Sequence, residues 1–156
     1  MTPAPERARQ YATKRASGTV LLIEDTDYLR EIIEHELERL GYHVISAPNG
    51  RTGLRLALDV LPDVILSDYS MPEMNGLEVL EYLRHTPRAA HLPFILMSSY
   101  PLRMFVHECE RLKASALLEK PFELAELKAA LQQAISEKPV FFSTPGVRLP
   151  AQSVMA

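Results

Sequence analysis

One stretch decides the fold, Val64-Ile65-Leu66-Ser67-Asp68-Tyr69-Ser70-Met71-Pro72-Glu73-Met74-Asn75-Gly76. Its apolar start is typical of a buried strand, whereas Pro72, Asn75 and Gly76 are turn formers. Asp68 therefore stands at the carboxyl end of a predicted strand, which is where open α/β sheets bind ligands. By itself such an acid is more often a helix cap or a turn residue, so the other segments must decide its role.

Length and composition restrict the class of protein. A chain of 156 residues holds one domain of ordinary size plus tails, and it can bury a sizeable core. The hydrophobic fraction of 47% and the charged fraction of 24% are those of a soluble globular protein. No apolar run approaches the roughly 20 residues that span a bilayer, so we expect no membrane anchor. The net charge of −3 argues against DNA as a direct partner.

The two ends of the chain differ from the middle. Residues 1–18 have little apolar periodicity and carry Arg7, Arg9, Lys14 and Arg15 against Glu6, so they are predicted to be a flexible basic arm. This arm lacks the apolar segment of a secretory signal. Cys109 is the single cysteine and cannot form an internal disulfide, and a cytoplasmic location is therefore predicted.

Strand and helix patterns alternate five times between Thr19 and Glu137. The predicted strands are Val20–Ile23, Tyr42–Ala47, Val64–Ser67, Phe94–Met97 and Ser115–Leu118. Apolar stripes at helical spacing follow each of them, over residues 29–40, 54–61, 77–83, 102–112 and 123–137. This alternation is typical of an α/β protein with a doubly wound, five-stranded parallel sheet that is covered by helices on both faces.

Polar side chains follow four of these strands. Because the carboxyl ends of parallel strands share one edge of the sheet, Glu24, Asp25, Asp68, Ser98 and Lys120 can converge there. Three carboxylates in one place raise each other's pKa values unless a cation neutralises them, and Mg²⁺ is the cation that such hard oxygen ligands suit. The lysine ammonium and the serine hydroxyl could bind the oxygens of a phosphoryl group. The set therefore predicts phosphoryl transfer to a nucleophilic carboxylate.

Each of these residues also has a purely structural interpretation. Asp25, Thr26 or Asp27 could cap the helix that follows the first strand, and Ser98 or Ser99 the helix after the fourth strand. Lys120 could be an ordinary surface lysine. Cys109 lies in an apolar helical stripe, so we expect a buried structural thiol. The joint placement at consecutive strand ends favours function for the acids, the serine and the lysine.

Together these motifs resemble the receiver domain of two-component response regulators. The resemblance rests on Glu24-Asp25, Asp68 with Met71-Pro72 and Asn75-Gly76, Ser98-Ser99, and Lys120-Pro121-Phe122, and it covers roughly Thr19 to Ile135. It implies a flavodoxin-like (βα)5 fold with strand order 2-1-3-4-5. The expected organisation is an arm at 1–18, a receiver domain at 19–137, and a proline-containing tail at 138–156 with no output domain.

The resemblance also implies roles for the site residues. Asp68 would accept a phosphoryl group from a phosphohistidine on a histidine kinase or a phosphotransfer protein. Asp25, Asp68 and the backbone carbonyl of Ser70 would bind Mg²⁺ directly, and Glu24 would act mainly through water. Ser98 and Lys120 would contact the phosphoryl group, and the Lys120-Pro121 peptide bond is expected to be cis.

Some positions depart from the family pattern. Leu117 stands three residues before the lysine, where an aromatic side chain often couples its inward rotation to the switch hydroxyl of Ser98. Ser99 and Tyr100, which follow that hydroxyl, are predicted to belong to the switch segment. Tyr100 and Ser70 occupy positions that in this family modulate dephosphorylation, and we expect both to tune the lifetime of the phosphorylated state.

The predicted function is that of a stand-alone, phosphorylation-controlled module in two-component or phosphorelay signalling, and not that of a metabolic enzyme. Its output would be binding to a downstream protein through the fourth helix, fifth strand and fifth helix, the face through which a homodimer would also form. Val140-Phe141-Phe142 is too apolar for an inert tail and is predicted to dock on this domain or on a partner. The alternatives are a Mg²⁺-dependent phosphohydrolase, which would usually need an acid where Ser70 stands, and a receiver-like scaffold that works unphosphorylated.

Overall fold

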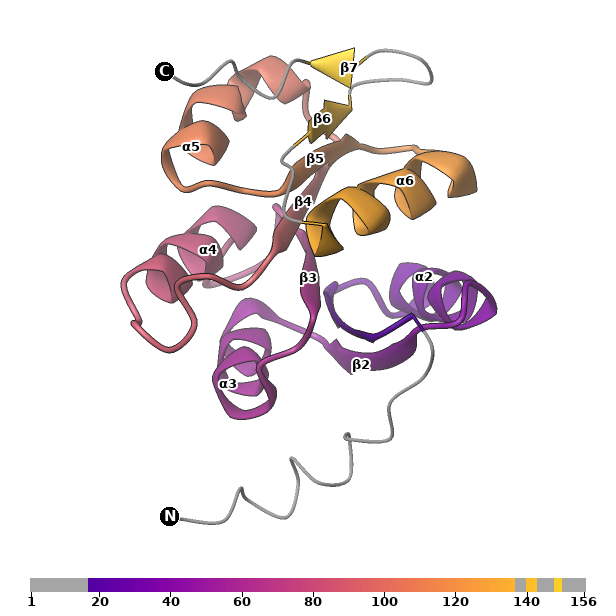
Figure 1. The fold of residues 1–156 in the computed structure, drawn as a ribbon, viewed down its shortest axis with the longest axis horizontal. Helices are drawn as coiled ribbons and strands as arrows, with labels where there is room; N and C mark the ends of the chain where they lie inside the picture. The colour runs from indigo at the N-terminus through magenta and orange to yellow at the C-terminus, as the bar shows by residue number, and fades with distance from the viewer. Residues whose placement is uncertain (1–16, 137–139, 143–147, 150–156) are drawn as a thin grey trace.

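The computed structural model describes residues 17–136, 140–142 and 148–149, which form one sheet with helices on both faces (Figure 1). The strands stand in the order β2-β1-β3-β4-β5-β6-β7. Their bounds are β1 Thr19–Ile23, β2 His43–Ala47, β3 Val64–Asp68, β4 Phe94–Ser98, β5 Ala116–Glu119, β6 Val140–Phe142 and β7 Arg148–Leu149. The helices are α2 Asp27–Arg39, α3 Gly50–Val60, α4 Gly76–Arg84, the 3-10 helix η1 Leu102–Met104, α5 Val106–Arg111 and α6 Leu124–Ile135.

Local sequence signals explain where the helices begin and end. The side chain of Asn49 accepts a hydrogen bond from the Thr52 N–H at the start of α3, and Asn75 accepts one from the Glu78 N–H at the start of α4. Gly41 takes a φ of +95° just after the α2 C-cap, a conformation that costs glycine little. These signals fix the short loops that bring each helix back onto the sheet.

The core has two parts, one on each face of the sheet. Leu21 and Ile23 of β1 pack with α3, α4 and α5, whereas Val20 and Leu22 of the same strand pack with α2 and α6. Successive side chains of a strand point to opposite faces, so a strand covered on both sides must be apolar at every position. β3 and β4 are accordingly buried along their whole length.

Arg84 braces the edge of the sheet opposite to the carboxyl ends of the strands. Its guanidinium donates to the carbonyls of Leu112 at 2.7 Å, Leu92 at 2.9 Å, Ala90 at 3.0 Å and Lys113 at 3.1 Å. Burial lowers the pKa of this guanidinium from its ordinary value. One side chain therefore ties α4 to the segments that lead into β4 and β5.

The predicted doubly wound sheet and its order 2-1-3-4-5 are confirmed for the first five strands, which are all parallel. The number of strands in the described residues is larger than predicted, because the C-terminal segment adds β6 parallel to β5 and β7 antiparallel to β6. The single helix predicted over residues 102–112 is instead two pieces, η1 and α5. Phe105, with φ −115° and ψ −13°, is the one residue between them.

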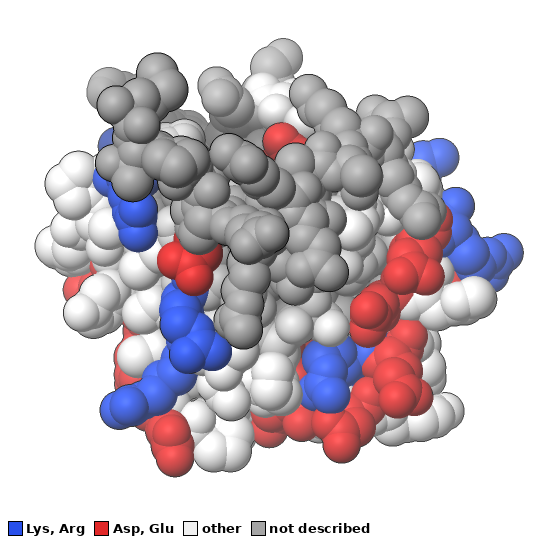
Figure 2. Space-filling view, turned by 90° about the horizontal axis from the view of Figure 1, so that it is seen from below, with Lys and Arg blue, Asp and Glu red and all other residues white. Residues whose placement is uncertain are grey.

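Other expectations concern the ends and the surface. Most of the predicted arm lies outside the described residues, as does most of the predicted tail. In the described part of the chain, no helix has the length and apolar character needed to cross a membrane. Lys and Arg side chains lie interspersed with Asp and Glu on the face that Figure 2 shows, so its described surface carries both signs of charge. Cys109 is fully buried, and burial raises the pKa of its thiol to about 12, so the predicted structural role is confirmed.

Candidate functional site

Four strand ends meet at one edge of the sheet. In the parallel register Ile23 pairs with Ser67, Asp68 with Met97, and Ser98 with Glu119, so the four strands end at nearly the same level. The residues at or just after these ends are Glu24, Asp25, Asp68, Ser98 and Lys120, the set predicted to converge. The register therefore places side chains up to 96 positions apart in one pocket.

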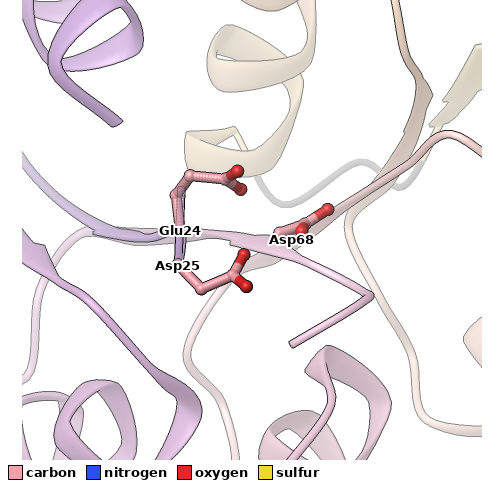
Figure 3. Close-up of side chains that lie close together, drawn as sticks. All are labelled: Glu24, Asp25 and Asp68. Atoms are coloured by element: carbon pink, nitrogen blue, oxygen red, sulfur yellow. The ribbon is translucent and has the colours of Figure 1, made fainter. Parts of the chain in front are cut away.

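The centre of the pocket is a cluster of three carboxylates. One oxygen from each of Glu24, Asp25 and Asp68 lies within 4.8 Å of the others. Figure 3 shows Glu24 and Asp25 leaving the end of β1 and extending toward Asp68 on β3. Glu24 and Asp68 are buried, with 1% and 7% of their surface exposed, while Asp25 is intermediate. Asp25 therefore gives the cluster its access to solvent.

Lys120 pairs with two of the three acids. Its Nζ lies 3.0 Å from Oδ1 of Asp68 and 3.3 Å from Oε2 of Glu24, with the lysine side chain only 14% exposed. The interpretation of Lys120 as an ordinary surface lysine is thus wrong. The Lys120-Pro121 peptide bond is cis, as expected.

One ammonium does not balance three carboxylates. Burial is the main cause that raises the pKa of Glu24 to about 7, followed by the charge of Asp68, and Lys120 offsets this only in part. Burial likewise raises the pKa of Asp68, against the lowering effect of Lys120. A buried site with this excess of negative charge favours a further cation. Three carboxylates with one side open to water fit Mg²⁺, which takes oxygen ligands and keeps several waters.

Backbone contacts hold the acids in place. The Tyr69 N–H donates to the Met97 carbonyl at 2.8 Å, which anchors the chain just after Asp68 onto β4. Gly76, the first residue of α4, packs on the same turn, and a Cβ atom there would clash with the Asp68 carbonyl oxygen. Only glycine allows α4 to start so close to the acid.

Arg30 is a site residue that the sequence did not reveal. From the first turn of α2 it donates to the backbone carbonyl of Glu24 at 2.8 Å and pairs with Asp27 at 2.6 Å. It thereby fixes the loop that carries Glu24 and Asp25. Arginine is common in the first turn of a helix, so the sequence alone did not single out Arg30. Its hydrogen bond to the Glu24 carbonyl depends on the path of the loop between β1 and α2.

The helix-cap interpretation of the acids is not supported. Thr26 is the N-cap of α2 and makes no side-chain cap bond. Asp27 is the first helical residue and pairs with Arg30. The carboxyl group of Asp25 lies in the acidic cluster.

Ser98 is held in a defined position. It is 1% exposed, its Oγ accepts a hydrogen bond from the Tyr100 N–H at 3.0 Å, and its carbonyl accepts one from the Lys120 N–H at 2.7 Å. The next helical turn starts after Pro101 without a side-chain cap, so neither Ser98 nor Ser99 caps it. Ser98 therefore connects the end of β4 with Lys120 on one side and with the loop of Tyr100 on the other.

Aromatic side chains lie beside this segment, but not at position 117. Leu117 is fully buried in the core. Tyr69 contacts Phe105 with ring centroids 4.5 Å apart, and Tyr100, which is 48% exposed, lies edge-on to Tyr69 at 6.2 Å. The residue after Asp68 and the residue two after Ser98 are thus in contact.

The remaining predicted residues lie on the rim. Ser70, in the loop between β3 and α4, is exposed, and so is Ser99 after β4. Both belong to loops that border the pocket.

The sequence model of the response regulator receiver domain matches residues 20–132. The chain belongs to this family. The resemblance inferred from the strand-end motifs is therefore confirmed, and the protein carries a receiver domain of two-component signalling.

Curated relatives include both long and short proteins. The receiver domain is 36% identical over 121 residues to the regulatory protein AtoC of Escherichia coli, covering 77% of this chain and 26% of AtoC. It is 29% identical over 114 residues to a probable chemotaxis protein CheY of Rhizobium etli, covering 72% of this chain and 88% of that protein. The chain thus spans about a quarter of the first relative and most of the second.

Solved receiver structures agree with the fold. Chemotaxis protein CheY4 of Vibrio cholerae superimposes with a TM-score of 0.70 at 30% identity, covering 74% of this chain and 97% of CheY4. The receiver domain of the sensor histidine kinase PA1611 of Pseudomonas aeruginosa gives the same TM-score and identity, covering 78% of this chain and 99% of that domain. That structure has a magnesium ion coordinated in its active site cleft.

Proposed function

We propose that this receiver domain accepts a phosphoryl group on Asp68 in a Mg²⁺-dependent reaction and so switches its binding to another protein. The observation that carries the proposal is the placement of the Asp68 carboxylate, 3.0 Å from the Lys120 ammonium and within 4.8 Å of Glu24 and Asp25. Asp68 can act as a nucleophile there, because the lysine can disperse charge on an incoming phosphoryl group.

The transfer is a single displacement. A carboxylate oxygen of Asp68 attacks the phosphorus of a phosphohistidine, the O–P bond forms as the N–P bond breaks, and the electron pair returns to the imidazole nitrogen. Attack by water later breaks the O–P bond, releases inorganic phosphate and restores the carboxylate. Lys120 stays close to the transferred oxygens in both steps. Ser98 reaches them once its Oγ gives up the hydrogen bond from the Tyr100 N–H.

The acidic cluster would hold the metal ion. Asp25, Asp68 and the backbone carbonyl of Ser70 are the proposed direct ligands, with Glu24 acting through water. When bound, Mg²⁺ supplies positive charge that stabilises the transferring group. The placement of three carboxylates beside one ammonium supports this assignment. The pKa values of Glu24 and Asp68 are raised mainly by burial, and a bound cation would favour the ionised form of both groups.

An apolar groove beside the pocket supports a protein as the phosphodonor. The groove has a volume of about 660 Å³ and runs between α2 and the start of α6, with Lys120 in its wall. Ile32 and Leu124 in its lining are 42% and 41% exposed, so the groove presents apolar side chains to solvent next to the charged pocket. We propose that a histidine kinase or phosphotransfer protein packs on this groove while its phosphohistidine reaches Asp68.

The central experiment uses phosphoramidate, a small donor with the same N–P bond as phosphohistidine. With Mg²⁺ the intact mass should rise by one phosphoryl group, and the increment should be absent in Asp68→Asn and after chelation. Asp59→Asn, at an exposed aspartate of α3, is the matched control and should keep the increment. A phosphorylated Asp68→Asn protein, or rapid turnover of unrelated phosphate esters by the wild type, would contradict the proposal.

The donor groove has its own test. Ile32→Asp should slow transfer from an autophosphorylated histidine kinase that phosphorylates the wild type, while the reaction with phosphoramidate stays unchanged. Equal slowing with both donors would indicate damage to the pocket instead of loss of a docking surface.

We further propose that residues 19–137 form the receiver domain and that its output is binding to a downstream protein. The face expected to carry this output is formed by α5, β5 and α6, and the outer edge of β5 in it is paired with β6. Ser70, Ser99 and Tyr100 are the residues proposed to tune the lifetime of the phosphorylated state.

A further inference from the structure

The C-terminal segment adds a strand to the outer edge of β5. Ala116, Leu117 and Leu118 of β5 pair in parallel with Val140, Phe141 and Phe142 of β6, and β7 pairs antiparallel with β6. Figure 1 shows β6 beyond β5, between α5 on one side and α6 on the other. The family match ends at residue 132, so both strands lie beyond the part of the chain that the family shares.

Without β6, β5 would be the edge strand of the sheet. An edge strand presents a row of unpaired backbone N–H and C=O groups, which pair readily with a strand of another chain. Two copies related by a twofold axis can pair their β5 edges with each other, because a twofold interface uses the same surface patch on both subunits. The face made by α5, β5 and α6 is therefore suited to a second copy of this chain, and β6 occupies it.

The covalent connection gives β6 a large advantage over a second copy. Only residues 136–139 separate the end of α6 from the start of β6. A short linker gives an effective concentration on the order of millimolar. At micromolar protein a competing strand of equal intrinsic affinity is thus outcompeted by about a thousandfold.

We propose that β6, with β7 paired to it, is an intramolecular cap that covers the α5–β5–α6 face and keeps a second copy of this chain from pairing with β5. The cap also lies next to the site, because the β5 residues that it pairs with end two positions before Lys120. The proposal does not depend on phosphoryl transfer, and its test uses no phosphodonor.

The test compares the wild type with the full-length double variant Phe141→Pro/Phe142→Pro. Neighbouring residues of a strand direct their N–H groups to opposite edges, so two adjacent prolines remove a donor toward β5 whichever residue supplies it. The matched control, Ala151→Pro/Gln152→Pro, places the same change outside the two strands. Hydrogen exchange of β1 and β3 amides monitors the fold in each variant.

Two results are expected. The outward-facing amides of β5 should exchange at least tenfold faster in the double variant than in the wild type or the control. Sedimentation should also show the double variant forming dimers at tens of micromolar, where the wild type is monomeric. Adding a synthetic peptide of residues 138–150 should slow the exchange again and dissociate the dimers.

Three results would overturn the proposal. Equal exchange of the β5 amides in wild type and double variant would mean that β6 does not cover β5 in solution. Fast exchange without dimers up to millimolar protein would mean that the cap does not compete with a second copy. If the double variant unfolds, the adjacent pair Val140→Pro/Phe141→Pro replaces it, and unchanged exchange and association in that variant count against the cap.

Discussion

Replacing Glu24 with glutamine should make the metal-free protein more stable at pH 8. Glu24 is 1% exposed, and its pKa is raised from the ordinary value of 4.5 to about 7, mainly by burial. The difference between these two values corresponds to about 3 kcal/mol of unfavourable free energy for the ionised side chain in the folded state. Glutamine has nearly the same shape and carries no charge, so it avoids this cost.

The sign of the pH dependence follows from proton binding. The folded state holds the Glu24 proton more tightly than the unfolded chain does, so proton binding at Glu24 stabilises the folded state. This stabilisation is complete below about pH 4.5 and is lost as the pH rises through about 7. The wild type and Glu24→Gln should therefore have similar stability near pH 4.5. They should diverge to about 3 kcal/mol at pH 8, which is about 10 °C in Tm for a domain of this size.

The assay is urea unfolding in the presence of a chelator, from pH 4.5 to pH 8.5. Taking the difference between the two proteins removes the contributions of the five histidines and of the other acids. Glu38→Gln, at an exposed position of α2, is the control and should change stability by less than about 0.5 kcal/mol. Adding millimolar Mg²⁺ at pH 8 should stabilise the wild type more than Glu24→Gln, since the ion binds the folded pocket. A difference between the proteins that is constant with pH would refute the reasoning.

Three further substitutions test other parts of the structure. Lys120→Met removes the cation from Asp68 and should lower the free energy of unfolding by about 3 kcal/mol without metal. The rise of Tm on adding Mg²⁺ should become larger than in the wild type, and a smaller rise would contradict the charge balance described for the pocket. Gly76→Ala forces a Cβ against the Asp68 carbonyl and should cost about 2 kcal/mol in urea unfolding, so wild-type stability would count against that contact. Arg84→Lys loses most of four hydrogen bonds to backbone carbonyls and should cost about 2 kcal/mol. Its response to Mg²⁺ should not change, because it lies at the other edge of the sheet.

The strand-end residues could be placed from the sequence because two simple regularities act together. Apolar runs of four or five residues alternate with helical stripes, and a parallel sheet brings all strand ends to one edge. Asp68 and Lys120 then meet at 3.0 Å although 52 positions separate them. Asparagine and glycine at the turns, such as Asn75 and Gly76, indicated where the next helix begins.

Contacts that depend on the exact course of a loop could not be predicted in this way. Arg30 is a helical arginine like many others until the loop of Glu24 brings a carbonyl within 2.8 Å of it. The break at Phe105 interrupts an apolar stripe that reads as one continuous helix, because burial spacing is preserved across η1 and α5. β6 has only three residues, too few for an alternating pattern to reveal a strand.

At position 117 the sequence predicted the absence of an aromatic side chain, but not the aromatic contacts that lie near Ser98. The sequence indicated that no aromatic side chain stands there, and the structure places a leucine that is fully buried in the core. It could not indicate that Tyr69, Phe105 and Tyr100 come together beside Ser98, since these three residues lie on three different segments.

The burial of Cys109 makes this protein convenient for spectroscopy. The only thiol of the natural sequence is inaccessible, and its pKa of about 12 keeps it protonated at neutral pH. Maleimide dyes and nitroxide spin labels react with exposed thiolates, so they should leave the unaltered chain almost unmodified. A cysteine introduced at an exposed position such as Met104 would then be labelled selectively, without first removing a native one. Distances across the molecule could thus be followed in solution with the core intact.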